Sequence, residues 1–126
     1  MGKALIDWCY KWLPIIMGCH CRPERSFHVK GRSFPVCARC TGMLAGFLIC
    51  LLSCFFWQPH PAWMAVLMLP GIIDGTVQMK TSYTSNNLRR LWTGLLMGYG
   101  SMSLLTWSLG ATYRLGFRWG LQLFGK

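Results

Sequence analysis

The sequence has little charge and very little acid. Only 13% of its 126 residues are Asp, Glu, Lys or Arg, about half the fraction found in soluble domains. The three acids are Asp7, Glu24 and Asp74, whereas hydrophobic residues make up 53% and the net charge is +10. So little polar surface disfavours nucleic acid as the partner of this basic chain. The composition instead indicates an integral membrane protein, with its basic residues facing the cytoplasm and anionic lipid head groups.

Three stretches contain almost no charge and are predicted to cross the membrane, at residues 41–57, 63–79 and 91–109. Prolines on both sides of His60 separate the first two stretches. Residues 4–17 and the amphipathic tail, residues 110–126, are predicted to form interfacial helices. The expected fold is therefore all-α. It is a single membrane domain, residues 1–126, with about three transmembrane helices and interfacial helices near both ends.

The distribution of basic residues predicts the topology. Seven lysines and arginines precede the first predicted span, the turn at 58–62 has none, and the loop at 80–90 has three. The positive-inside rule places the Cys/Arg-rich loop at 18–41 and the loop at 80–90 in the cytoplasm of a multi-pass plasma-membrane protein. The basic tail then lies outside, in conflict with the same rule. Two spans separate the two loops, so both lie on one face of the membrane in either orientation.

Glycines recur four residues apart, at 42/46, 71/75, 94/98 and 116/120. This spacing allows close helix packing in lipid. The contacts lie either within the chain or between protomers, and we expect a homo-oligomer.

The loop at 18–41 carries a pattern typical of a metal site. Cys37 and Cys40 form a C-x-x-C pair, and Cys19 lies upstream at a zinc-ribbon-like separation. The fourth ligand of a tetrahedral zinc ion is expected to be His20 or Cys21. His28 is a weaker alternative. A reactive thiol pair and unliganded structural cysteines are the other interpretations, because a thiol at a helix N-terminus beside an arginine also ionises readily.

Asp74 is an acid within a predicted span, and such residues are usually paired or functional. Gln78 lies one turn further along the same helix, and the two are the candidate catalytic residues. In one interpretation Asp74 forms an ion pair with an arginine and ties helix ends together. In the other it belongs to a polar pocket for an ion or a phosphate-bearing head group. The expected anion-binding residues are Arg22, Arg25, Arg32, Arg39, Asn86, Arg89, Arg90 and Thr93.

These motifs resemble a family of small prokaryotic membrane proteins catalogued as a domain of unknown function. The resemblance covers roughly residues 18 to 100. It rests on Cys19-His20, Arg22-Pro23-x-Arg25-Ser26-Phe27, Pro35-Val36-Cys37-Ala38-Arg39-Cys40-Thr41-Gly42, Pro70, Asp74-Gly75, Gln78, Asn86 or Asn87, Arg89 or Arg90, and Thr93-Gly94. It implies a multi-span membrane protein with no established activity. Cys21 departs from the family pattern, which favours His20 as the fourth metal ligand.

Three functions are compatible with the sequence. The first is a membrane protein with a zinc site at the cytoplasmic boundary, in metal-ion transport or sensing. The second is a membrane-embedded enzyme or binding protein for a lipid or a lipid-linked phosphate. The third is an accessory subunit without chemistry of its own. Whether the chain is an enzyme stays open at this point.

Overall fold

The computed structural model describes residues 2–20, 22–83 and 86–125. The described residues form four α-helices, a short 3₁₀ turn and a two-stranded hairpin. Their bounds are α1 Gly2–Ile16, η1 Pro23–Arg25, β1 His28–Val29, β2 Arg32–Ser33, α2 Ala38–Ser53, α3 Pro61–Lys80 and α4 Asn87–Phe124. The all-α prediction is confirmed, with the small hairpin as the exception.

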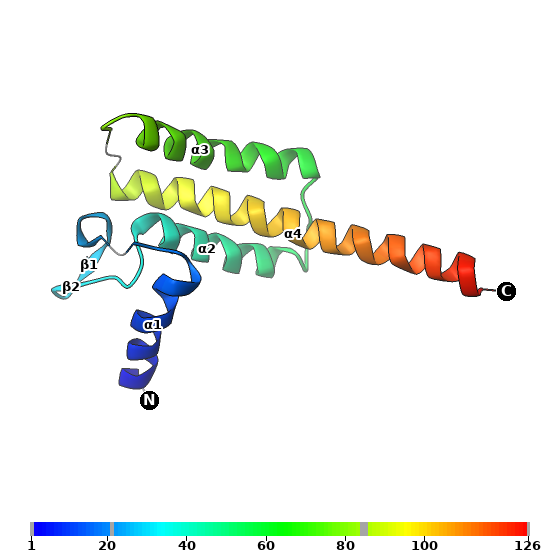
Figure 1. Cartoon of the computed structure of the whole chain (residues 1–126), viewed down its shortest axis with the longest axis horizontal. Helices are drawn as coiled ribbons and strands as arrows, with labels where there is room; N and C mark the ends of the chain where they lie inside the picture. The colour runs from blue at the N-terminus through cyan, green and yellow to red at the C-terminus, as the bar shows by residue number, and fades with distance from the viewer. Residues whose placement is uncertain (1, 21, 84–85, 126) are drawn as a thin grey trace.

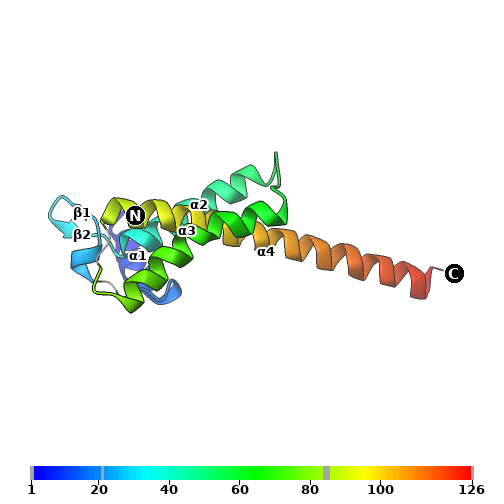
Figure 2. The same cartoon turned by 90° about the horizontal axis from the view of Figure 1, so that it is seen from above.

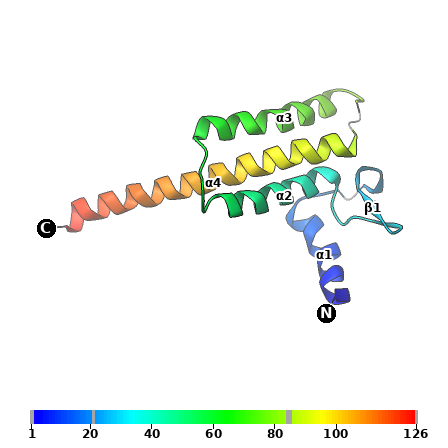
Figure 3. The same ribbon diagram turned by 180° about the vertical axis from the view of Figure 1, so that it is seen from behind.

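The helices α2, α3 and α4 lie side by side, with α4 between the other two (Figures 1 and 3). The β-hairpin and the turn from α3 to α4 lie at one end of this bundle, and the turn from α2 to α3 lies at the other. Helix α1 stands at a steep angle to the bundle near the hairpin. The Tyr10 hydroxyl donates a hydrogen bond of 2.8 Å to the Ser33 carbonyl, which ties α1 to the hairpin.

Local sequence signals explain two of the connections. The hairpin turns at Lys30 and Gly31, whose φ angles are 50° and 78°, as a two-residue turn between twisted strands requires. Helix α3 begins with Pro61 in its first turn, where the missing N–H costs nothing. The Nδ1 atom of His60 accepts a hydrogen bond of 3.3 Å from the Ala62 N–H, so His60 caps this helix.

Glycines bring α2 and α4 into backbone contact. A Cβ atom on Gly42 or Gly46 would collide with the backbone of α4, and one on Gly94 or Gly98 would collide with the backbone of α2. These two pairs of glycines therefore pack against each other within one chain, as the Gly-x-x-x-Gly spacing permits. The glycines at 116 and 120 meet nothing within 4 Å among the described residues.

The interior of the bundle is polar and glycine-rich, and its outside is apolar. The largest fully buried side chains are Met64, Val36, Cys50 and Ser103, and the buried charged residues include Asp74. On α3, by contrast, the large side chains from Trp63 to Val77 are mostly exposed. The described chain exposes 9630 Å², against about 6,800 Å² for a compact soluble protein of its mass. This distribution suits a lipid surrounding.

One helix of the described residues is long and apolar enough to cross a membrane, and it is α3, with 20 residues. This agrees with the predicted span at 63–79. The span predicted at 41–57 corresponds to α2, which has only 16 residues and ends at Ser53 because the chain turns there. The length and composition of the described helices therefore do not support the predicted bundle of three full-length transmembrane spans.

Helix α4 also differs from expectation. The third predicted span, 91–109, and the tail, 110–126, are not separate elements, because α4 continues unbroken from Asn87 to Phe124 over 38 residues. No proline or capping residue interrupts it between the two. Its second half leaves the bundle and projects alone (Figure 2).

Candidate functional site

Three of the predicted metal ligands lie together at the hairpin end of the bundle. The Sγ atoms of Cys19, Cys37 and Cys40 lie within 4.8 Å of one another. Cys37 and Cys40 occupy the start of α2, one turn apart, with their Sγ atoms 3.5 Å apart. Cys19 follows α1, and its Sγ accepts a hydrogen bond of 3.3 Å from the Cys37 N–H. The cluster thus joins the segment after α1 to the first turn of α2.

The arrangement suits a thiolate-bound metal ion. Zinc–sulfur bonds of about 2.3 Å in a tetrahedron place two sulfur atoms about 3.8 Å apart. The Sγ atoms of Cys37 and Cys40, 3.5 Å apart, are close to this value, and all three Sγ atoms lie within 4.8 Å of one another. Each cysteine is half-buried, so an ion there would be shielded without being sealed from solvent.

The pKa of the Cys37 thiol is lowered from 9.0 to about 5. The hydrogen bond with the Cys40 thiol is the largest cause, and partial burial opposes it. Further hydrogen bonds from the backbone at Cys40, from Cys19 and from the backbone at Arg39 act in the same direction. A helix N-terminus favours the anion in the same way. The lowered pKa favours the thiolate form of Cys37, which is the form that binds metals and reacts with electrophiles.

The other predicted ligands are not part of this group. His20 is exposed and does not belong to the three-thiol cluster, although it follows Cys19 directly. His28 lies on β1 and is also exposed. Cys21 falls outside the described residues. The fourth ligand therefore stays a prediction.

Asp74 lies at the centre of an ion-pair network beside this cluster. Its side chain is 3% exposed. One carboxylate oxygen, Oδ2, accepts hydrogen bonds from Arg39 Nη2 and, at 2.9 Å, from Gln78 Nε2. The other, Oδ1, lies 3.7 Å from Arg89 Nε. Asp74 thus connects the first turn of α2, the end of α3 and the start of α4.

This pairing fits the interpretation of Asp74 as a tie between helix ends. Both candidate catalytic residues, Asp74 and Gln78, bond to each other, and the carboxylate also faces two guanidinium groups. A buried carboxylate whose Oδ2 atom is already occupied by Arg39 and Gln78 is poorly placed to take a proton from a substrate. The geometry therefore gives no support to Asp74 as a catalyst.

The structure adds Tyr83 to the residues expected from sequence. Its hydroxyl accepts a hydrogen bond of 2.9 Å from Arg89 Nη1, and the guanidinium lies 5.8 Å from the ring centre. The sequence feature that could have indicated this contact is the position of Tyr83 six residues before Arg89 in a short basic turn.

The remaining residues predicted to bind anions differ in their surroundings. Arg25 and Arg39 line one cavity of about 320 Å³. Arg90 is buried, and the Thr93 hydroxyl donates to backbone carbonyls of its own helix. Asn86 is the N-cap residue of α4 and makes no side-chain capping bond. Arg22 is exposed and contributes its carbonyl as acceptor for the buried Ser26 hydroxyl. Arg32 lies on β2, beside α1.

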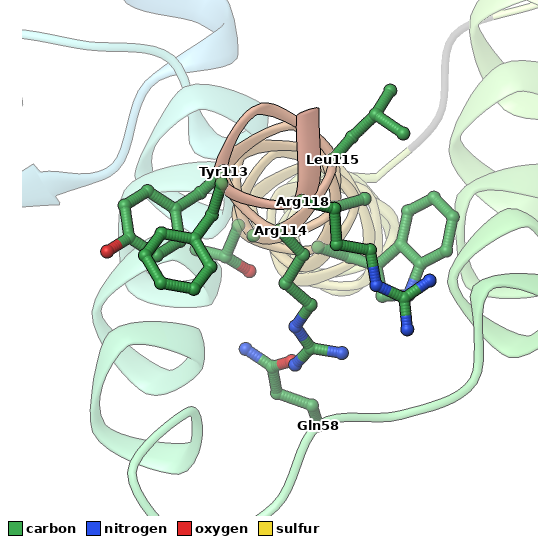
Figure 4. A pocket seen from close by; sticks show the side chains of 10 residues that line it. Gln58, Tyr113, Arg114, Leu115 and Arg118 are labelled. Carbon is green, nitrogen blue, oxygen red and sulfur yellow. The ribbon is translucent and has the colours of Figure 1, made fainter. Parts of the chain in front are cut away.

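Another hollow lies at the opposite end of the bundle. It encloses about 660 Å³ where the second half of α4 leaves its neighbours. Figure 4 shows Gln58 and Arg114 next to each other at this hollow, with Arg118 and Tyr113 turned to either side. Its walls come almost entirely from α4, so it is an open groove with few converging groups.

Comparison with known proteins places the chain among predicted membrane proteins. A protein of Methanothermobacter thermautotrophicus, named only as uncharacterized, is 40% identical over 93 residues, covering 70% of this chain and 83% of the relative. An uncharacterized protein of Methanocaldococcus jannaschii is 32% identical over 88 residues, covering 64% of this chain and 56% of the relative. No solved structure matches the chain.

A family profile described as "Predicted membrane protein (DUF2085)" matches residues 19–104. The match begins at the first cysteine of the thiol cluster and ends within α4, so it contains the whole ion-pair network. Because it covers more than half of the sequence, the chain belongs to the DUF2085 family of predicted membrane proteins.

Proposed function

We propose that this protein is a membrane protein that binds a thiophilic metal ion, zinc in the first instance, through Cys19, Cys37 and Cys40. The observation that carries the proposal is the convergence of three thiols from two separate segments within 4.8 Å. Thiolates of this number and spacing favour zinc among the abundant divalent ions. The lowered pKa of Cys37 provides one ligand already in its anionic form at neutral pH.

Three thiolates leave the fourth tetrahedral position to His20, Cys21 or water. Structural zinc sites have four protein ligands, whereas sites that exchange ligands keep one position open. His20 is adjacent to Cys19 and exposed, so it would need only a local movement to reach the ion. A fourth ligand of this kind suits a sensor, in which metal binding changes the position of the loop at 18–41.

The network around Asp74 favours sensing over transport. A carboxylate that conducts cations would need to be accessible and free of fixed positive charge. Asp74 is instead buried and paired with Arg39, which lies between Cys37 and Cys40 in the sequence. Metal binding at the two cysteines would therefore fix Arg39 and, through it, the junction of the three bundle helices.

The proposed setting is a bundle in which α2, α3 and the first half of α4 enter the bilayer together, with the metal site at the cytoplasmic boundary. The support is the outward-facing apolar surface and the glycine contacts between α2 and α4. Helix α2 is about 24 Å long by its residue count, which is shorter than the hydrocarbon core. Local thinning or burial against α4 would accommodate it.

Elemental analysis of the detergent-purified protein tests the metal site. We expect near-stoichiometric zinc in the wild type and a loss of most of it in Cys37→Ser, because one ligand and the lowest-pKa thiol are removed together. The matched control is Cys9→Ser, which changes a half-buried thiol of α1 outside the cluster and should retain zinc. A wild-type preparation that is folded and free of bound metal would contradict the proposal.

A further inference from the structure

The end of the bundle that carries the thiol cluster has an excess of positive charge around Asp74. Arg39 and Arg89 pair with Asp74. Arg25 and Arg39 repel the charge of the buried Arg90, whereas Asp74 and Cys37 attract it. Four guanidinium groups therefore lie near one carboxylate and one acidic thiol. The net positive charge of this group favours a bound anion.

A cavity opens directly onto this cluster. It encloses about 320 Å³ and is bordered by Arg25 from η1, Arg39 from α2, and the last turn of α3 with the residues that follow it. Its lining contains no acidic side chain, and Asp74 accepts hydrogen bonds from two of the lining residues, Arg39 and Gln78. An anion in the cavity would therefore meet guanidinium groups in its walls.

The polar groups of the lining are hydrogen-bond donors. The Thr81 hydroxyl is already used, since it donates to the Val77 carbonyl, and Gln78 donates to Asp74. Ser82 and Tyr83 add two hydroxyl groups to the two guanidinium groups. The Nε atom of Arg39 is buried and has no hydrogen-bond partner among the described residues. Donors of this number, with two planar guanidinium groups among them, suit the several oxygens of a phosphate.

The volume sets the size of the ligand. At about 320 Å³, the cavity lies at the lower limit of small-molecule sites. The cavity can therefore accept a phosphate group with a small substituent. Its walls are mostly polar. We propose that this cavity binds a phosphate group, either as a free phosphate ion or as the head group of an anionic phospholipid at the membrane boundary.

The inference is independent of the metal proposal, because the donors that carry it are not metal ligands. The two sites nevertheless share the first turn of α2, where Arg39 lies between Cys37 and Cys40. Phosphate binding by a protein that contains no zinc would support this inference and contradict the metal proposal. Zinc binding by a protein that does not bind phosphate would support the metal proposal and contradict this inference.

The test uses the full chain purified in a neutral detergent, with two probes. Inorganic phosphate is titrated calorimetrically, and binding of phosphatidylglycerol is compared with that of phosphatidylcholine by native mass spectrometry. We expect saturable binding of one phosphate-bearing molecule and about tenfold weaker binding in Arg25→Ala, since one charge-assisted contact is lost. Arg25 is exposed and forms no ion pair with a described residue, so this variant should fold normally.

The matched control is Arg32→Ala, which removes an equal charge from the same loop but outside the cavity. It should bind like the wild type. Phosphate binding that phosphatidylglycerol does not displace identifies the free ion as the ligand, and binding of the lipid alone identifies the head group. The proposal is overturned if neither probe binds saturably, or if the two arginine variants weaken binding equally, since the effect would then be general surface charge.

Discussion

At the scale of single residues, Asp74 holds the position that decides the geometry of the site. It is the one acid in the three bundle helices, and it contacts residues from the beginning of α2, the end of α3 and the beginning of α4. Arg39 reaches it from between two candidate metal ligands. One carboxylate therefore connects three helix ends beside the thiol cluster and the arginine-lined cavity.

Replacing Asp74 by Asn should destabilise the protein while leaving its shape nearly unchanged. The amide keeps an acceptor for Gln78 but removes the counter-charge of Arg39, whose side chain is only 26% exposed. Breaking one partner of such a buried pair costs about 3 kcal/mol. The free energy of unfolding in detergent measures this loss. Asp7→Asn, on the exposed α1, is the control and should leave stability as it is. Equal stability of the two variants would show that the ion pair contributes nothing.

Much of this site could be predicted residue by residue. The C-x-x-C pair, Cys19 and the lone acid of the bundle helices all stand out because such residues are costly or reactive in an apolar chain, and the structure brings them to one end of the bundle. Tyr83 could not be predicted, because its role follows from the course of the turn before α4. The separation of His20 from the thiols likewise depends on a local backbone path that spacing does not determine.

At the scale of elements, the junction of α2 and α4 depends on glycine. The carbonyl of Arg39 occupies the space where a Cβ of Gly94 would lie, and the Leu91 carbonyl does the same at Gly42. Since a methyl group cannot fit against a backbone carbonyl that belongs to a helix, the two helices would have to separate. Arg39 would then move with α2, so the packing of these helices also fixes the ion-pair network.

Two substitutions of the same kind in α4 should therefore have opposite effects. Gly94→Ala forces the helices apart and should lower the free energy of unfolding by about 1–3 kcal/mol. Gly116→Ala meets open space and should be neutral or stabilising by up to about 1 kcal/mol, because alanine is the better helix former. Thermal unfolding in detergent compares the two. A stable Gly94→Ala variant would mean that α2 and α4 are not in close contact.

The sequence predicts that the helices exist more accurately than it predicts where they end. Hydropathy predicts three apolar segments. The first is predicted to end at residue 57, whereas α2 ends at Ser53. Hydropathy also divided α4 at residue 109, where the composition changes and the backbone does not. A change of composition marks a change of surroundings, and a helix can pass through such a boundary without a break.

At the scale of the whole molecule, the two ends of the bundle differ in chemistry. One end holds the thiol cluster, the Asp74 network and the arginine-lined cavity. From the other end the second half of α4 projects alone, with Arg114 and Arg118 among exposed aromatic residues. The glycines at 116 and 120, which meet no other described atoms within 4 Å, lie on this projecting half.

The direction of α4 gives the last prediction. Its 38 residues correspond to about 57 Å, nearly twice the thickness of the hydrocarbon core. If the thiol-cluster end is cytoplasmic, as the basic loops predict, α4 begins in the cytoplasm and its second half emerges on the other side. Green fluorescent protein fused to the C-terminus should then be dark in bacterial cells, and alkaline phosphatase at the same site should be active.

The control is a fusion after Tyr83, which follows α3. At this site green fluorescent protein should fluoresce and alkaline phosphatase should be inactive. Fluorescence at both sites would place the tail in the cytoplasm and show that α4 does not cross the membrane. The two arginines of the tail would then agree with the positive-inside rule, with which an outside tail conflicts.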